Sequence, residues 1–208
     1  MQPQTVTKSN TAPALVLASA SPSRRALLEA AGLTISVQPT FVDEAQIKTS
    51  LLKKRVSPDN IALALARAKG LAGTQKNPES VIIAADQILF CDDTLYDKPT
   101  NMDEARTHLK SLRGKSHTLI GATVLTRNNK EIWTHTDTAT MTMRSFSDAF
   151  LDDYLVSAGT SILSSVGAYQ LEDRGIQLFD AIEGGYFTIL GLPILPLLSQ
   201  LRAMGTIP

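Results

Sequence analysis

A long β-hairpin in the middle of the chain most limits what this sequence can fold into. Two segments of high β-propensity, His117 to Thr126 and Glu131 to Met143, flank the turn dipeptide Asn128-Asn129. The second segment alternates strictly and places on one face Ile132, Thr134, Thr136, Thr138, Thr140 and Thr142. An antiparallel pair of this length excludes a purely parallel sheet.

Apolar runs and helix-start signals alternate along the rest of the chain. Buried strands are expected at residues 14–18, 81–85 and 186–190, with the second apolar run continuing through 88–90. Ser-Pro pairs at 21–22 and 57–58 indicate helix starts, because serine caps a helix and proline fits its first turn. Further helices are expected at 100–112, 147–158 and 193–204, the first with Thr100 and Asp103 as a capping box. This order predicts an α/β fold with helices flanking a mixed central sheet.

The first two helices have predicted buried faces. The helix that begins at Ser21-Pro22 and ends at Gly32 is expected to bury Leu27, Leu28 and Ala31. The helix that begins at Ser57-Pro58 is expected to bury Ile61, Leu65, Ala68 and Ala72. Lys69 lies about 80° from Ile61 around the second helix, so it belongs to the edge of that buried stripe.

Length and composition indicate a folded protein with one domain. The chain has 208 residues, of which 43% are hydrophobic, and this excludes intrinsic disorder. Residues 1–12 are polar and are expected to form a flexible arm, with a single domain over residues 13–208. The single cysteine, Cys91, excludes an internal disulfide and fits a reducing compartment. No histidine has metal-ligand spacing to it, so a zinc site is not expected.

Charge and hydropathy exclude two classes of partner. Lys plus Arg and Asp plus Glu each number 20, so the chain lacks the basic excess that drives non-specific binding to nucleic acid or anionic membranes. The apolar run from Pro13 to Ala20 is too short and too poorly supplied with positive charge for a secretory signal. The run from Ile189 to Leu198 is interrupted by two prolines and is shorter than a membrane span. We expect a cytoplasmic protein without a nucleic-acid or membrane partner.

The first helix opens in a way that helix stability alone does not favour. Its first turn contains Ser23, Arg24 and Arg25, although the partial positive charge of a helix N-terminus favours Asp or Glu there. Two guanidinium groups beside the hydroxyls of Ser19 and Ser21 suit a multiply charged anion such as a phosphate chain. Alternatively, both arginines fold back onto surface carboxylates. The motif alone favours neither interpretation.

Other charged residues lie at positions where α/β proteins often bind ligands. Asp86 directly follows the apolar run 81–85, so it is expected at the end of a strand. Lys98 precedes a helix, and Glu44 follows Asp43 in an expected loop. Taken singly, each is more typical of an ordinary cap or a solvated surface residue. The Walker A pattern is absent, because Leu109 occupies the required glycine position, and there is no G-x-S-x-G nucleophile motif.

Taken together and in order, several segments resemble the Maf family of nucleoside triphosphate pyrophosphatases. The similarity covers nearly the whole chain after residue 13 and rests on Leu17 to Leu28, Val42-Asp43-Glu44, Ala66-Arg67-Ala68-Lys69, Ala84-Ala85-Asp86-Gln87, Lys98-Pro99, Gly167-Ala168-Tyr169 and Ile182-Glu183-Gly184 through Gly191-Leu192-Pro193. The resemblance implies two lobes with a nucleotide cleft, often a homodimer, and a link to inhibition of septum formation.

The resemblance also implies a reaction and a set of site residues. The reaction is divalent-metal-dependent hydrolysis between the α and β phosphates, with Mg²⁺ as the expected ion and Mn²⁺ as the alternative. The implied functional residues are Ser19, Arg24, Glu44, Lys69, Asp86, Lys98 and Glu172. The three cations suit a triphosphate, and the carboxylates of Glu44 and Asp86 suit magnesium. Asp86 either deprotonates the attacking water or ligates the metal.

Departures from the commoner family pattern point to one branch of the family. Ser23 occupies the place of the first of two arginines, and Arg25 follows the second, so both Arg24 and Arg25 are candidates for binding phosphate. Gln87 replaces a threonine and Glu172 a glutamine. These changes resemble the branch that acts on 7-methyl-GTP, because a carboxylate accepts the paired N–H donors of guanine, provided that Glu172 reads the base and does not bind metal.

The sequence leaves two alternative functions open. One is a pyrophosphatase that prefers dTTP and UTP. The other is a nucleotide-binding regulator of cell division whose hydrolysis is incidental. The presence of both Glu44 and Asp86 favours an enzyme, since binding alone does not require both carboxylates.

Overall fold

The computed structural model of the chain describes residues 12–208, so the expected arm at residues 1–12 lies almost wholly outside the described part. The strands are β1 (Leu15–Leu17), β2 (Ile35–Val37), β3 (Val81–Cys91), β4 (Thr94–Tyr96), β5 (Ser116–Arg127), β6 (Lys130–Met143) and β7 (Phe179–Glu183). The α-helices are α1 (Pro22–Ala30), α2 (Glu44–Lys53), α3 (Pro58–Lys76), α4 (Met102–Leu112), α5 (Asp148–Ala158), α6 (Tyr186–Ile189) and α7 (Ile194–Ala203). Short 3₁₀ helices span Gly159–Ser164, Val166–Ala168 and Arg174–Leu178.

The sheet is mixed, as the sequence predicts. Its strand order is β2-β1-β3-β5-β6-β7, with β4 beside the far end of β3. β1 runs parallel to β2 and β3, whereas the other pairs are antiparallel. The expected hairpin is β5 and β6, and its turn residues Asn128 and Asn129 have φ values of 52° and 57°. Asparagine tolerates these left-handed values, which give a turn whose twist matches the strands.

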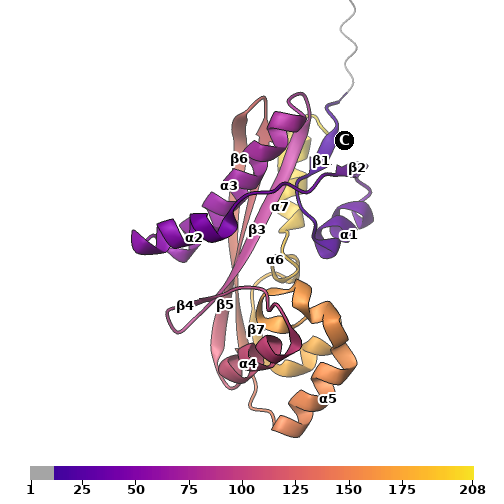
Figure 1. Cartoon of the computed structure of the whole chain (residues 1–208). Helices are drawn as coiled ribbons and strands as arrows, with labels where there is room; N and C mark the ends of the chain where they lie inside the picture. Colours follow the sequence, from indigo (N-terminus) through magenta and orange to yellow (C-terminus); the bar gives the residue numbers. More distant parts are fainter. Residues whose placement is uncertain (1–11) are drawn as a thin grey trace, which may run out of the picture.

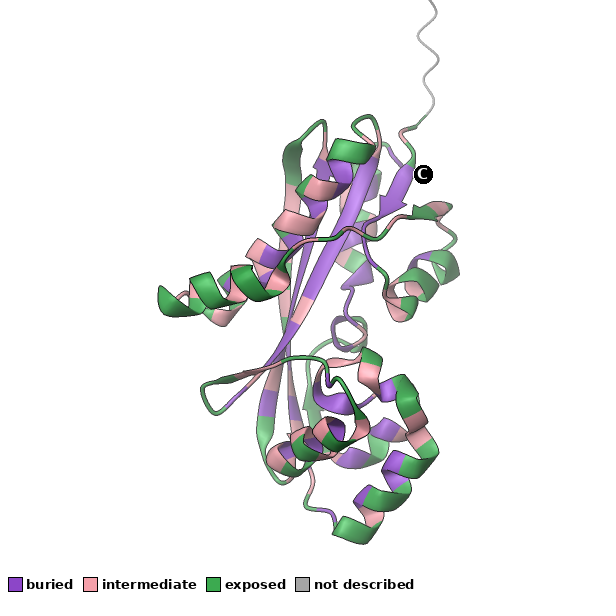
Figure 2. Cartoon of the chain, viewed as in Figure 1, coloured by how far each residue is buried: buried purple, intermediate pink, exposed green. Residues whose placement is uncertain are grey.

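Two lobes share the three long strands β3, β5 and β6 (Figure 1). In the upper lobe, α3 packs on one face of the sheet through Ile61 and Leu65, and α1 and α7 pack on the other through Leu28 and Leu197. In the lower lobe, α4, α5 and the 3₁₀ helices enclose a core around Leu109 at the far ends of the same strands. Burying one such leucine stabilises the fold by about 1.5–3 kcal/mol. Figure 2 shows that β3 and β5 are mostly buried through both lobes while the outer helix faces are exposed.

Helix α3 lies unusually close to the sheet because two glycines face it. A Cβ atom on Gly70 would come within 2.9 Å of Thr126, and one on Gly73 within 2.6 Å of Ile82. The buried face of α3 therefore includes Ile61, Ala62, Leu65, Ala66, Gly70 and Gly73. Ala68 and Ala72 are only half-buried, so the predicted stripe was displaced around the helix. Hydrophobicity alone does not mark glycines as contact positions.

Three other local predictions were wrong. Residues 186–190 form helix α6 and its end, not a strand, and the neighbouring strand is β7. A five-residue apolar run fits either structure, and here Ile189 turns into the core. The cap of α4 is Asn101, whose side chain accepts from the Glu104 amide at 2.8 Å, one residue later than the predicted box. Ala31 is exposed, because α1 ends at Ala30.

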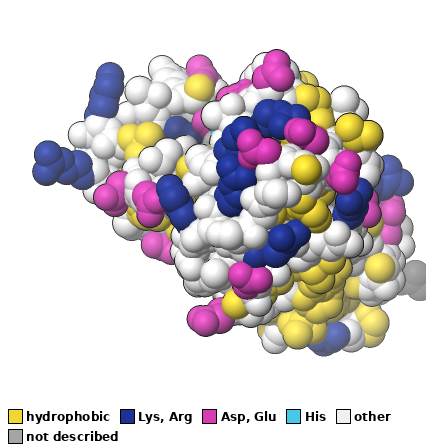
Figure 3. Space-filling view, turned by 90° about the horizontal axis from the view of Figure 1, so that it is seen from below, with side chains coloured by type: hydrophobic (Ala, Val, Ile, Leu, Met, Phe, Trp, Pro, Cys, Tyr) yellow, Lys and Arg dark blue, Asp and Glu magenta, His cyan; other side chains and the backbone are white. Residues whose placement is uncertain are grey.

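The surfaces of α4 and α5 carry charges of both signs. Asp148 of α5 accepts from Arg113 at 2.7 Å and from Lys110 at 3.2 Å, and Arg106 pairs with Asp152. Figure 3 shows basic and acidic side chains side by side on the face seen from below. Between residues 12 and 208, no helix combines the length and the hydrophobicity that a membrane crossing requires.

Candidate active site

A gap beside strand β3 forms the floor of the site. On its outer edge β3 pairs with β1 through Val81–Ile83 and with β4 through Leu89–Cys91, which leaves residues 84–88 without a neighbouring strand on that side. Asp86 lies within this gap and pairs only with Ala122 of β5 on the other edge. The prediction that Asp86 ends a strand was therefore wrong, because β3 continues past it. The ligand-accessible position arises because β1 stops at Leu17.

Alternation along β3 sends consecutive side chains to opposite faces of the sheet. Ile82 and Ala84 face α3, and Asp86 follows on the same face, where it meets Lys69 of α3. Gln87 faces the other way and donates from Nε2 to the carbonyl oxygens of Thr188 (2.8 Å) and Ile189 (3.2 Å). Asp86 and Gln87 are therefore adjacent on β3 but contact two different walls of the site.

Arg24 donates a hydrogen bond to β3 within this gap, where no neighbouring strand pairs with β3 on that edge. Its Nη1 donates to the Ala85 carbonyl oxygen at 2.7 Å and to Ser19 Oγ at 3.2 Å, and its Nε donates to the Gly191 carbonyl oxygen at 2.8 Å. Burial lowers the pKa of Arg24, and the charges of Asp86 and Glu44 act in the opposite direction. The guanidinium stays protonated at neutral pH, since arginine does not lose its charge in proteins.

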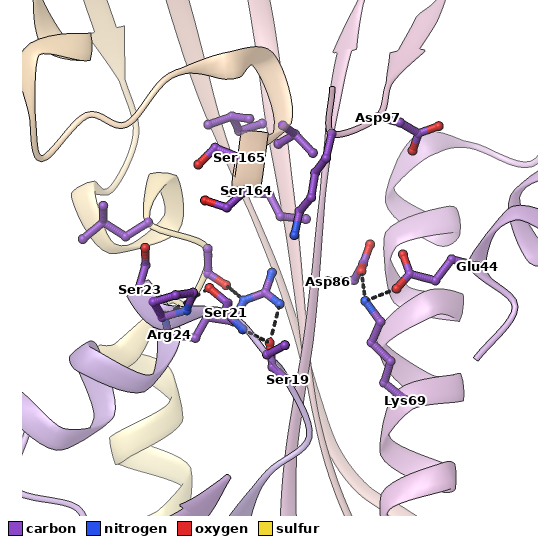
Figure 4. A pocket seen from close by; sticks show the side chains of 18 of the residues that line it. Ser19, Ser21, Ser23, Arg24, Glu44, Lys69, Asp86, Asp97, Ser164 and Ser165 are labelled. Carbon is purple, nitrogen blue, oxygen red and sulfur yellow. Dashed lines mark hydrogen bonds and ion pairs between the residues drawn. The ribbon is translucent and has the colours of Figure 1, made fainter. Parts of the chain in front are cut away.

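The start of α1 orients Arg24. Ser21 caps this helix and accepts from the Arg24 amide at 3.4 Å, while Ser19 Oγ accepts from the Ser21 amide at 3.2 Å. The predicted Ser-Pro helix start is confirmed, with Pro22 in the first turn. Figure 4 shows Ser19, Ser21 and Arg24 along one wall of the cavity, with Glu44 and Lys69 on the opposite wall.

Lys69 lies between two carboxylates. Its ammonium group forms an ion pair with Asp86 and lies 3.0 Å from Glu44 Oε1. Asp86 is only 6% exposed, and such a buried carboxylate is costly unless it is paired. The position of Lys69 at the edge of the buried face of α3 agrees with the sequence prediction. Glu44 begins α2 directly after the cap Asp43, which accepts from the Gln46 amide at 2.8 Å.

Lys98 adds a further positive charge to the cavity. It lies in the connection between β4 and α4 and lines the same cavity as Arg24 and Lys69. Burial, followed by the neighbouring charges of Arg24 and Lys69, lowers the pKa of Lys98. An anion in the cavity would relieve this repulsion.

Glu172 and Ser23 contact each other at the cavity although they are 149 residues apart in the sequence. Ser23 belongs to α1, Glu172 follows the 3₁₀ helix Val166–Ala168, and Ser23 Oγ donates to Glu172 Oε1 at 3.4 Å. Both residues line the cavity. The sequence motifs that differ from the commoner family pattern therefore meet in space.

The cavity has a volume of about 730 Å³, which is within the range of small-molecule sites. The structure brings to it eight of the nine candidate residues, namely Ser19, Arg24, Glu44, Lys69, Asp86, Gln87, Lys98 and Glu172. Arg25 is not among the residues that line it, and its Nε donates instead to Glu29 Oε1 at 2.8 Å on the exposed side of α1.

Several cavity residues were not predicted from the sequence. They are Thr40, Phe41, Lys48, Ser164, Ser165 and Gln170. None has a distinctive sequence context, and Ser164 and Ser165 reach the site only because the 3₁₀ helices fold back over it (Figure 4).

The acidic residues of the site fit a metal held jointly with a ligand. Among residues 12–208, no three His, Cys, Asp or Glu side chains are arranged to hold a metal by themselves. Two carboxylates, Glu44 and Asp86, flank one ammonium group at the position a cation would take. Magnesium is commonly bound by one or two carboxylates, with phosphate oxygens and water completing the shell.

The fold and the cavity define an α/β protein whose cleft combines basic side chains with carboxylates. A sequence profile described as "Maf-like protein" matches residues 14–204. The chain is 49% identical over 195 residues to a 7-methyl-GTP pyrophosphatase of Rhizobium meliloti (strain 1021), with 94% of this chain and 98% of the relative covered.

Two further relatives show the same extent of similarity. A 7-methyl-GTP pyrophosphatase of Mesorhizobium japonicum is 45% identical over 193 residues, with 93% of this chain and 97% of the relative covered. A nucleoside triphosphate pyrophosphatase of Paramagnetospirillum magneticum is 44% identical over 190 residues, with 91% and 98% covered. The chain belongs to the Maf family.

Proposed function

We propose that this Maf-family protein is a nucleoside triphosphate pyrophosphatase. It hydrolyses the bond between the α and β phosphates and releases a nucleoside monophosphate and pyrophosphate. The observation that carries the proposal is the convergence of Arg24, Lys69 and Lys98 on a cavity that also holds Asp86 and Glu44. The names of its relatives agree with this activity.

The cations bind and orient the triphosphate. Arg24 is held rigidly by Ala85 and Gly191, so it loses little conformational entropy when it binds a phosphate oxygen. Charge on the phosphate oxygens is redistributed in the transition state, and fixed positive groups stabilise it without reorganising.

Asp86 acts on the attacking water. The water oxygen forms a bond to the α phosphorus as the bond from that phosphorus to the α-β bridging oxygen breaks, and pyrophosphate leaves with the electron pair. Asp86 accepts the water proton; in the alternative role its carboxylate would be one of the groups that hold the divalent ion. Lys69, already paired with Asp86, fixes the position of this carboxylate.

A divalent cation, Mg²⁺ or Mn²⁺, fits between Glu44 and Asp86 once phosphate oxygens are present. When bound, such an ion neutralises phosphate charge and polarises the reacting phosphoryl group. Lys69 would then shift its ammonium group toward the phosphates.

The proposed substrate is a modified purine nucleotide, of which 7-methyl-GTP is the first candidate. Ser23 lies on the wall opposite Lys69 and Glu44 (Figure 4) and contacts Glu172, which suits a base at one end and phosphates at the other. The Glu172 carboxylate accepts from the N1 and N2 groups of guanine, a pairing that uracil and thymine do not match.

A panel of nucleoside triphosphates tests the activity and the base preference together. Purified protein is assayed for pyrophosphate release from 7-methyl-GTP, GTP, dTTP and UTP, with magnesium, with manganese and with chelator. We expect 7-methyl-GTP to have the highest kcat/KM and chelator to abolish turnover. Faster hydrolysis of dTTP or UTP would reject the base preference and leave the reaction class intact.

The same panel addresses the regulator of cell division as an alternative function. A regulator with incidental hydrolysis would bind nucleotides with turnover too slow to matter and with little discrimination among bases. Release of orthophosphate in place of pyrophosphate would contradict cleavage between the α and β phosphates.

We also propose a cellular location and an oligomeric state. A reducing, cytoplasmic location suits Cys91, a free thiol that is only 3% exposed. A homodimer and a role in septum formation are carried over from the sequence resemblance, and a single domain over residues 13–208 is proposed from length and composition. Size-exclusion chromatography with light scattering tests the dimer.

A further inference from the structure

Lys48 is a cation of the cavity wall that the proposed mechanism does not use. It lies on α2 four residues after Glu44, so the two side chains project from the same side of the helix. Both line the cavity, and the Lys48 side chain is only 20% exposed. The sequence contains no motif around Lys48, and a lone helical lysine is normally a surface residue.

The ion-pair partner of Lys48 comes from the other lobe. Asp97 follows β4, directly precedes Lys98 and lines the same cavity. It pairs with Lys48 although its own side chain is 69% exposed. The pair therefore joins α2 to the connection after β4 at the wall of the cavity, and each member is near a residue assigned to phosphate or metal binding. Figure 4 shows Asp97 on the same side of the cavity as Glu44.

We propose that Lys48 binds the phosphate chain of the substrate and that Asp97 forms an ion pair with Lys48 when no substrate is bound. This inference rests on the proposed function and extends its phosphate-binding set. A phosphate chain carries more charge than a carboxylate and offers more acceptor oxygens, so it is the stronger partner for an ammonium group. An exposed ion pair contributes little free energy, and its exchange for a phosphate contact is favourable.

Asp97 has an opposing effect on the same substrate. Its carboxylate repels an incoming triphosphate and competes for Lys48. Asp97 therefore weakens the binding of both triphosphate and pyrophosphate, and product release is faster as a result.

A purely structural role for the pair makes a different prediction. If the ion pair only holds the two lobes together, removal of either partner has the same effect. If Lys48 binds phosphate and Asp97 competes for it, removal of one weakens binding and removal of the other strengthens it. The sign of the two changes distinguishes these roles.

The experiment compares Lys48→Met, Asp97→Asn and the double variant. Steady-state kinetics gives KM and kcat for the best nucleotide of the panel, and titration calorimetry gives the Kd for inorganic pyrophosphate with magnesium. We expect Lys48→Met to raise KM and the pyrophosphate Kd by about 10- to 100-fold, the range for one hydrogen bond to a charged group. We expect Asp97→Asn to lower both by about two- to fivefold and the double variant to resemble Lys48→Met.

Lys53→Met provides the matched control. Lys53 lies on the same helix, is exposed and does not line the cavity, so its removal is expected to leave both quantities unchanged. Thermal unfolding confirms that each variant is folded.

Three outcomes overturn the inference. Increases in KM for both single variants would indicate a structural pair, and no change in either would remove Lys48 from the site. A wild-type protein that neither hydrolyses any triphosphate nor binds pyrophosphate would overturn the proposed function as well. Activity in the wild type with unchanged variants would overturn only the role of Lys48.

Discussion

At Asp86, folding and chemistry make opposite demands on one side chain. A carboxylate that is 6% exposed destabilises the fold unless it is paired, and Lys69 provides the pairing. The same pairing holds the carboxylate in the cavity, where it can act on a water molecule or a metal.

Asp86→Asn is expected to lower kcat by at least about 100-fold, the lower end for loss of a general base. The amide has nearly the same shape, and Lys69 keeps Glu44 as a partner, so the variant is expected to fold. Kinetics on the best nucleotide of the panel, with circular dichroism as the control for folding, checks both statements. A near wild-type kcat would remove Asp86 from the reaction.

The two neighbouring arginines are expected to differ sharply. Arg24→Ala leaves the carbonyl oxygens of Ala85 and Gly191 without their partner, at about 1–3 kcal/mol for each buried group, and removes a phosphate-binding charge. Arg25→Ala removes only an exposed pair with Glu29, worth at most about 1 kcal/mol. Measured KM, kcat and melting temperature should all change more in the first variant, and equal changes would contradict the assigned positions.

Short sequence motifs predicted most charged residues of the candidate site, but they did not predict the groups that surround those residues. Glu44, Lys69 and Asp86 were named from short motifs, and the structure brings them within contact distance. The backbone carbonyls that bind Arg24 were not predictable, because they become available only where β1 ends beside β3. Lys48 was missed for a similar reason, since its partner is 49 residues away in the sequence.

Among the connecting elements, the turn after α6 holds the wall of the site that binds Arg24. Gly191 has a φ of +90°, a value that residues other than glycine rarely adopt, and its carbonyl oxygen accepts from Arg24. A Cβ atom there would lie 3.4 Å from Arg24 Nε and 3.6 Å from Gln87 Oε1. The glycine therefore satisfies both a backbone and a packing requirement.

Gly191→Ala is expected to lower the free energy of unfolding by about 1–2 kcal/mol and to reduce kcat/KM through displacement of Arg24. Gly32→Ala is the matched control, because Gly32 has a φ of +77° and a Cβ atom there would have no neighbour within 4 Å. Denaturant unfolding and kinetics on both variants separate backbone strain from the contact with Arg24. Equal loss of activity in the two variants would contradict a role for the contact.

Elements with strong local signals were predicted, and elements decided by packing were not. The hairpin turn, the Ser-Pro start of α1, and helices α5 and α7 follow from local residue preferences. Helix α6 and the displaced buried face of α3 depend on distant contacts, with the core around Ile189 and with Ile82 and Thr126. Short apolar runs and glycines carry too little local information to indicate either.

At the scale of the whole molecule, the protonation of one buried histidine makes the stability of the fold depend on pH. His117 is 2% exposed, its Nε2 lies 2.7 Å from the Tyr169 hydroxyl, and burial lowers its pKa to about 4. In the unfolded chain its pKa is about 6.5, so the unfolded state binds a proton that the folded state does not. This difference lowers stability as the pH falls from about 6.5 to about 4.

The contribution of His117 to this acid destabilisation is expected to reach roughly 3 kcal/mol. His117→Gln retains a hydrogen-bonding side chain but does not titrate. Denaturant unfolding at pH 7 and at pH 4.5 should show a smaller loss of stability in the variant than in the wild type. The same loss in both proteins would mean that His117 is already charged when folded or does not control the transition.

Continuity of β3, β5 and β6 through both lobes also determines how far the cleft can open. Lobes joined by a linker can swing as rigid bodies, but here any swing must bend three hydrogen-bonded strands together. The three hydrogen-bonded strands resist bending, and side chains such as Lys48 move more easily than the elements that carry them. The cleft is therefore expected to keep nearly the same width whether or not a nucleotide is bound.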